Sequence, residues 1–185
     1  MYELFALGEL RTGDKHGYML QEVLKRIGTV RAISSGTLYP LLSRLTDEGS
    51  IHLRLEEETE GGRPKKIYSL TESGRERFAA LMAKPLAHNA ETALVFRIKM
   101  VYFRYVPKTV RLACLTQYLD YLRGQREYVS RFERQLIAAQ PEPEIQRIQL
   151  LRTLDHRKHM GAADLDWVRA EIARVEASDP DEAQG

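Results

Sequence analysis

The sequence predicts a mainly α-helical protein that carries one small β-hairpin. Three observations support this fold class. Apolar side chains recur at helical spacing over most of the 185 residues, and only between residues 51 and 70 does their period fall to two. Beyond Lys84-Pro85 no alternating pattern appears, and alanine, arginine, leucine and tyrosine dominate. The chain therefore divides into a mixed amino-terminal part and an all-helical carboxy-terminal part.

Three helices are expected before the hairpin. The first covers residues 1 to about 11, and Thr12-Gly13-Asp14-Lys15 ends it. The second covers residue 16 or 17 to residue 27. The third begins at Ser34 or Ser35, because either hydroxyl can accept a hydrogen bond from an unpaired amide of the first turn, and it continues to residue 47 or 48.

The hairpin is expected from two alternating segments. Ile51 to Leu55 and Lys65 to Leu70 alternate apolar and polar residues, and Gly61-Gly62-Arg63-Pro64 between them is a turn. Thr71 then caps a fourth helix that begins at Glu72. Three helices followed by a hairpin in about 75 residues are the layout of a winged helix-turn-helix, in which the third helix enters the major groove and the hairpin is the wing.

Long helices are expected in the rest of the chain. Residues 90–106 are apolar around most of a helical circumference, and Pro107 separates them from a helix that extends to about residue 140. A last helix follows Pro141-Glu142-Pro143 and ends near Glu176. Both long helices carry apolar residues at the alternating three- and four-residue steps of a coiled coil, with Lys158 as a polar break in the last helix.

These helices carry more apolar surface than a small head could cover, so we expect a partner subunit and hence a homodimer. The expected domains are a winged helix-turn-helix DNA-binding domain over residues 1–84 and a helical dimerisation domain over residues 85–177. Residues 178–185 are polar and acidic and are expected to form a flexible tail.

Charge and composition exclude several classes of protein. The 28 basic and 26 acidic side chains leave a net charge of +2, so nucleic-acid binding must depend on a local cluster. The single cysteine, Cys114, cannot form an intrachain disulfide and is expected to be an inert, packed thiol. Charged residues interrupt every apolar run before about 18 residues, and the amino end lacks the features of a signal peptide. We therefore expect a cytoplasmic location.

No constellation for catalysis or for a cofactor is found in the sequence. It contains no glycine-rich phosphate loop, no nucleophile elbow and no paired histidine–glutamate zinc motif. Asp155, His156 and His159 share a helix face, but Arg157 and Lys158 crowd them with positive charge. We therefore expect a solvated helix face here, no metal site, no cofactor and no enzymatic activity.

An ordered set of motifs extends over the first 80 residues. These motifs are His16-Gly17-Tyr18, Ser35-Gly36-Thr37-Leu38-Tyr39-Pro40-Leu41-Leu42, Asp47-Glu48-Gly49-Ser50-Ile51, and Gly62-Arg63-Pro64-Lys65-Lys66-Ile67-Tyr68-Ser69-Leu70-Thr71. In these motifs the sequence resembles the PadR family of bacterial transcriptional regulators. Beyond residue 85 the chain resembles only the longer-tailed subfamily, by its length and helix pattern.

The resemblance implies a homodimeric repressor that binds a pseudo-palindromic operator. In many members of the family, a small molecule releases the repressor from the operator. It also implies which residues meet DNA. The recognition-helix positions are Ser34, Ser35, Thr37 and Tyr39, the wing positions are Arg63, Pro64, Lys65 and Lys66, and the second-helix positions are His16 and Tyr18. Small hydroxyls in place of bidentate arginines leave the operator sequence unreadable from these residues.

Alternatives stay open for several of these residues. Tyr39 is either a core aromatic or a phosphate donor, and Tyr18 is either buried or in contact with phosphate. A winged helix used for protein contacts is the alternative function, because Glu56, Glu57, Glu58 and Glu60 beside the wing would suit a basic protein partner.

An effector pocket for a small aromatic acid is a further hypothesis. Its candidate residues are Phe96, Arg97, Tyr102, Tyr105 and Trp167. Apolar concavities between domains are common ligand sites, and Arg97 would favour an anion such as a phenolic acid, which the family resemblance also implies. The alternative is that these aromatic residues fill the core.

Overall fold

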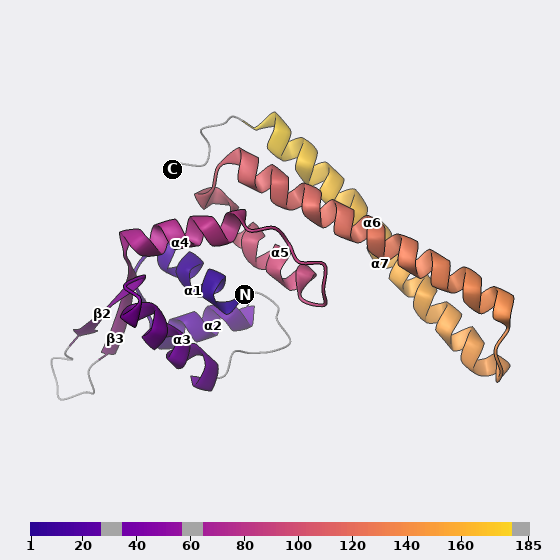
Figure 1. The fold of residues 1–185 in the computed structure, drawn as a ribbon, viewed down its shortest axis with the longest axis horizontal. Coiled ribbons are helices and arrows are strands. Elements are labelled where there is room, and N and C mark those ends of the chain that lie inside the picture. Colours follow the sequence, from indigo (N-terminus) through magenta and orange to yellow (C-terminus); the bar gives the residue numbers. More distant parts are fainter. Residues whose placement is uncertain (27–34, 57–64, 179–185) are drawn as a thin grey trace.

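The computed structural model describes residues 1–26, 35–56 and 65–178 (Figure 1). Its amino-terminal elements are α1 (Tyr2–Arg11), β1 (Lys15–His16), α2 (Gly17–Arg26), α3 (Ser35–Asp47), β2 (Ile51–Glu56), β3 (Lys65–Leu70) and α4 (Glu72–Ala83). The carboxy-terminal elements are α5 (Thr92–Val101), the 3-10 helix η1 (Phe103–Tyr105), α6 (Lys108–Ala139) and α7 (Glu144–Ala177). The predicted helices and the hairpin strands are confirmed, most of them with boundaries that shift by one or two residues. The segment 90–106 differs, because α5 ends at Val101 and the short η1 follows it. Ser34, Arg63, Pro64 and residues 179–185 lie outside the described residues.

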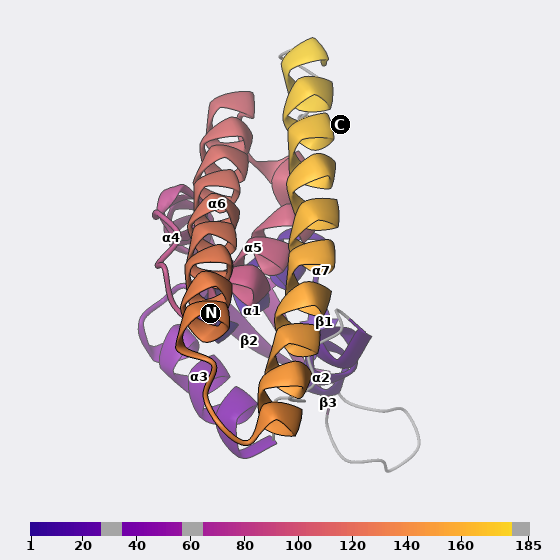
Figure 2. The same ribbon diagram turned by 90° about the vertical axis from the view of Figure 1, so that its right-hand side faces the viewer.

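The molecule consists of a head and a long arm. The elements α1 to α4 form the head, a winged helix-turn-helix with a three-stranded sheet at one side (Figure 1). Helices α6 and α7 form the arm, an antiparallel pair that projects far beyond the head (Figures 1 and 2). Helix α5 and η1, which we call the junction, lie between head and arm (Figure 1). Among the residues that the structure describes, no helix is both long and apolar enough to cross a membrane.

The sheet has the strand order β1-β3-β2, and all its pairs are antiparallel. Strands β2 and β3 pair from Ile51 opposite Leu70 to Glu56 opposite Lys65. The sequence does not predict β1, whose Lys15 lies opposite Tyr68 and whose His16 lies opposite Ile67. A strand of two residues is too short to show an alternating pattern, so only its pairing with β3 reveals it.

Helix α4 begins where the sequence predicts. The Thr71 hydroxyl accepts a hydrogen bond from the Gly74 amide at 3.1 Å and donates to the Ser50 carbonyl oxygen at 2.9 Å. This cap joins the first turn of α4 to the start of β2. A Cβ atom on Gly74 would lie 2.0 Å from the Ser50 carbonyl oxygen, so the close approach requires glycine.

One apolar core extends from the head through α5 into the arm. Its fully buried aliphatic side chains in the head come from three helices and strand β2 and include Leu7, Leu20, Leu38, Leu42, Leu45 and Ile51. The core continues through Ile98 of α5 to Leu115 of α6 and Leu165 of α7. Buried residues on both sides of residue 84 share this core. The domain boundary predicted at residue 84 therefore stays a prediction.

The seam of the arm follows the predicted spacing. The predicted seam residues that are buried are Leu115, Leu119, Leu122, Val129 and Leu136 on α6 and Leu154, Leu165, Val168 and Val175 on α7. The polar break at Lys158 has a structural explanation, because its ammonium lies 2.6 Å from the Glu133 carboxylate of α6. An interhelical ion pair therefore replaces one apolar layer.

Gly74→Ala should destabilise the head, because the new methyl group would collide with the backbone of Ser50. We expect a loss of about 3 kcal/mol in the free energy of unfolding, the upper range for overpacking. Gly124→Ala is the matched control, because Gly124 lies exposed within α6 with nothing near its Cβ position. This control should stabilise the protein by about 0.5–1 kcal/mol. Urea unfolding measures both, and equal stability of the two variants would contradict the packing described.

Candidate nucleic-acid interface

The structure brings the described candidate DNA residues to one edge of the head. His16 lies in β1, Tyr18 in the first turn of α2, Tyr39 in α3 and Lys66 in β3. Thr37 is exposed in the first turn of α3. For Ser35 and Lys65 the structure gives only their positions, at the starts of α3 and β3.

His16 and Tyr18 form one end of this edge. Their rings stack with centroids 5.6 Å apart and planes inclined by 15°. Tyr18 is 58% exposed, so its side chain is not buried in the head. The Nδ1 atom of His16 is buried and has no hydrogen-bond partner among the described residues. The stack therefore presents a tyrosine hydroxyl and a partly buried imidazole beside the first amides of α2.

Tyr39 packs against the glycine between these two residues. A Cβ atom on Gly17 would lie 2.9 Å from Cε1 of Tyr39, so the Tyr39 ring packs directly on the start of α2. The side chain is still 39% exposed and therefore lies at the edge of the core. This exposure is intermediate between that of a core aromatic residue and that of a fully exposed phosphate donor. Burial raises the pKa of the neighbouring Tyr68, and Tyr39 adds a second, smaller contribution.

The wing contributes an exposed cation. Lys66 is exposed near the tip of β3 and lies opposite Leu55 of β2, which is also exposed. Arg54 on β2 is exposed as well, and its guanidinium lies 3.9 Å from the Asp14 carboxylate. The described part of the wing therefore offers one positive charge at Lys66 that no acidic partner neutralises within the described residues.

A group of ion pairs fixes the far end of α3. Arg77 of α4 donates to Glu3 of α1 and to Glu48, which follows α3, and Arg44 of α3 donates to Glu3 at 2.9 Å. Partial burial opposes ionisation of Glu3, but the hydrogen bonds from Arg77 and Arg44 outweigh it and lower the pKa of this carboxyl. The sequence does not predict these ion pairs, because their members lie far apart in the chain and show no common spacing.

None of the five candidate effector residues lines any of three cavities found between residues that the structure describes. Phe96 is buried and stacks on Tyr118 at 3.7 Å, Arg97 is exposed, and Tyr105 is half-buried. Tyr102 is buried, and its hydroxyl binds Glu9, whereas Trp167 is 45% exposed. The three cavities have volumes of about 260, 180 and 280 Å³.

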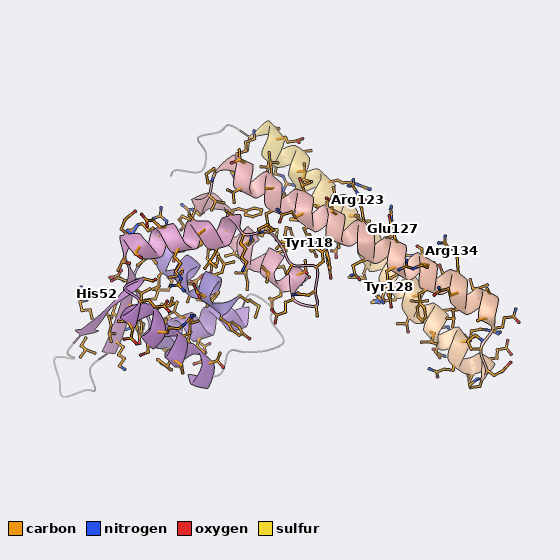
Figure 3. All side chains as sticks on the ribbon, in the orientation of Figure 1. His52, Tyr118, Arg123, Glu127, Tyr128 and Arg134 are labelled. Atoms are coloured by element: carbon orange, nitrogen blue, oxygen red, sulfur yellow. The ribbon has the colours of Figure 1, made fainter. Side chains whose placement is uncertain are left out.

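The cavity of about 260 Å³ is a groove on the arm. It begins beside Ala93 of α5 and continues between α6 and α7 past Tyr118, Tyr121, Val129 and Met160. Burial, with a smaller contribution from the nearby Asp164 carboxylate, raises the pKa of Tyr118 to about 12. Figure 3 shows Tyr118 and Tyr128 on one side of α6, with Arg123 and Glu127 on the opposite side.

Cys114 is buried among the core residues of α6, as expected for an inert thiol. Burial raises its pKa to about 11, although the nearby Lys99 opposes the shift. At neutral pH the group is therefore a protonated thiol with little nucleophilic character.

Comparison with known proteins identifies the family. The model of the PadR-like family of transcriptional regulators matches residues 6–80. A PadR-like transcription factor from Bacteroides fragilis is 30% identical; the matched region covers 44% of this chain and 76% of that one, with a TM-score of 0.40. This chain belongs to the PadR-like family of transcriptional regulators. The matched segment contains every residue predicted to meet DNA, and the arm of this PadR-like protein lies outside it.

Two further solved structures are similar to this PadR-like chain. PadR of Bacillus subtilis, in complex with operator DNA, is 21% identical over 94% of this chain and 98% of that one, with a TM-score of 0.45. The smu.1704 protein of Streptococcus mutans is 30% identical over 43% of this chain and 71% of that one, with a TM-score of 0.38. A comparison with curated proteins finds no match.

Proposed function

We propose that this chain is a sequence-specific DNA-binding transcriptional repressor that acts as a homodimer on a pseudo-palindromic operator. The observation that carries the proposal is the edge formed by His16, Tyr18, Tyr39 and Lys66. Here the exposed Tyr18 and Tyr39 lie at the start of α2, and the exposed Lys66 lies on β3, next to the residue that pairs with His16. The family membership supports the same function.

The edge suits a phosphate backbone. The first amides of a helix have no partners within it, so the start of α2 attracts an anion, and Tyr18 stands next to these amides. The Tyr39 hydroxyl, held across Gly17, can donate to a neighbouring phosphate. Lys66 on the wing supplies a cation that would reach the backbone from the other side of α3. These contacts set the register of the head without reading the sequence.

Base recognition would fall to the first turn of α3. Ser35 and Thr37 begin this helix, which is the second helix of the helix-turn-helix and would lie in the major groove. Their hydroxyls can donate or accept, so they can contact several bases. The ion pairs among Glu3, Arg44 and Arg77 hold the opposite end of α3 and so fix its angle to the head.

The arm supports dimerisation through the groove side of α6. Helix α5 fills the start of the groove, where Phe96 stacks on Tyr118, but beyond Ala93 the groove is open. Tyr128 and Phe132 continue on α6 with ring centroids 6.5 Å apart, and they are 50% and 37% exposed. We propose that a second copy of the chain covers this apolar surface, since a monomer would leave it in water.

We also propose that a small aromatic anion releases the protein from DNA. The cavity of about 280 Å³ lies between α1, α4 and α5, and its lining includes Leu4, Leu81, Pro85 and Val95 with Lys99 at one side. The apolar walls suit an aromatic ring, and Lys84 and Lys99 in the lining suit its acid group. A ligand there would act only through a different affinity for two head positions.

Replacing Lys66 with alanine should weaken binding to the DNA upstream of the chain's own gene and to unrelated duplex DNA alike. Removing two phosphate contacts from a dimer should reduce the log–log salt slope by up to about 2 units. Tyr39→Phe should weaken binding to both duplexes without changing the salt slope, because the hydroxyl carries no charge. Fluorescence anisotropy over a range of salt concentrations measures both effects. Arg152→Ala, which removes an exposed cation from the arm, should change neither affinity nor slope.

An unchanged slope in Lys66→Ala would show that the wing does not touch the backbone. If the full chain binds no duplex DNA at any salt concentration, the DNA-binding proposal fails and the protein-adaptor hypothesis replaces it.

Phe132→Glu should convert the dimer into a monomer, because it places a charge in the proposed apolar interface. Arg134→Glu is the matched control: it introduces the same side chain on the other side of α6, where Figure 3 shows Arg134 turned away from Tyr128. Sedimentation velocity at micromolar concentration should find a dimer for the control and for the unmodified chain. Dimers in all three proteins would place the interface elsewhere, and a monomeric unmodified chain would contradict dimerisation itself.

A further inference from the structure

The junction contacts the head through a tyrosine that lies directly on a glycine. Tyr102, the residue after α5, is 1% exposed, and a Cβ atom on Gly8 of α1 would lie 2.5 Å from its Cε2 atom. Phe78 of α4 packs edge-on against the same ring at 6.0 Å. The ring is therefore fixed on the backbone of α1, and Gly8 is the residue that permits this approach.

The hydroxyl of Tyr102 continues this contact to a buried carboxylate. It donates to Oε1 of Glu9 at 2.8 Å, and Glu9 is only 6% exposed. The other carboxylate oxygen, Oε2, lies 3.9 Å from the ammonium of Lys15, which is also largely shielded from water. A buried carboxylate is costly unless it is paired and hydrogen-bonded, so each of these three side chains depends on the others.

The chain of contacts ends at the proposed DNA-binding edge. Lys15 is the first residue of β1, and the next residue is His16, whose ring stacks on Tyr18. Because β1 has only two residues, few ladder hydrogen bonds to β3 fix its position. The ion pair of Lys15 with Glu9 therefore adds a side-chain contact to the pairing with β3 that holds β1 in place.

A second contact joins the junction to the end of α1. The guanidinium of Arg11, at the end of α1, lies 5.5 Å from the centre of the Tyr105 ring, and that of Arg104 lies 5.2 Å from it. Both contacts have the geometry of cation–π interactions. The junction thus meets the end of α1 on two sides, just before the turn that leads to β1.

From these contacts we infer that Tyr102 and Glu9 are positioning residues that hold β1 and His16 in the conformation that binds DNA. The inference rests on the proposed DNA-binding function. It makes operator affinity depend on the packing of the junction, because Tyr102 reaches His16 through Glu9 and Lys15. Since Pro107 and the start of α6 directly follow η1, a change in how the arm packs would reach β1 by this route.

The test compares Tyr102→Phe and Glu9→Gln with Tyr2→Phe in the full-length chain. Tyr2 is also a tyrosine packed against the core, but it lies outside the chain of contacts. We expect Tyr102→Phe to weaken operator binding between about 2-fold and 30-fold, the range found for residues that couple two sites. The double variant should be no weaker than Glu9→Gln alone, because both residues act in one chain, and Tyr2→Phe should bind like the unmodified protein.

A second readout separates positioning from general stability. Hydrogen–deuterium exchange of the β1 amides, measured well below the unfolding temperature, should be faster in Tyr102→Phe than in Tyr2→Phe. Equal exchange in these two variants, or equal operator affinity, overturns the inference. A full chain that binds no duplex DNA defeats the proposed function instead, and the exchange rates then still decide whether Tyr102 positions β1.

Discussion

The burial of α5 on two opposite sides is the constraint on which the rest of the structure depends. One side places Phe96 against Tyr118 of the arm, and the chain just after the helix places Tyr102 against Gly8 of the head. A helix in this position must be apolar around most of its circumference, which is what residues 90–106 show. The head and the arm therefore share one core, and the position of the arm affects the packing of the head.

A buried lysine completes this arrangement. The ammonium of Lys99 donates to the carbonyl oxygens of Met82 and Lys84, at the end of α4, while its stem lies in the core. Burial lowers the pKa of this lysine, and the two carbonyl oxygens accept hydrogen bonds from two of its three N–H groups. These oxygens belong to the last turn of a helix and have no partners within it, so a cation from α5 stabilises them. Lys99 thus joins α4 to α5 as Tyr102 joins α1 to the junction.

The sequence could predict what depends on local periodicity. The Thr71 cap, the two hairpin strands and the seam of the arm follow from spacing that neighbouring residues reveal. It could not predict β1, because two residues have no period, or the contact of Glu9 with Tyr102, whose partners lie 93 positions apart. The aromatic residues chosen for an effector pocket show a further limit. Composition alone does not separate a ring that fills a core, such as Phe96, from one that stays exposed, such as Trp167.

The central claim is that two heads, joined by their arms, meet DNA through the edge at His16, Tyr39 and Lys66. Hydroxyl-radical footprinting of the full-length chain on its own upstream DNA tests this claim most directly. The account predicts two protected regions related by a two-fold axis, with centres separated by about 10 bp or a multiple of that distance. A single protected region without this symmetry would contradict it.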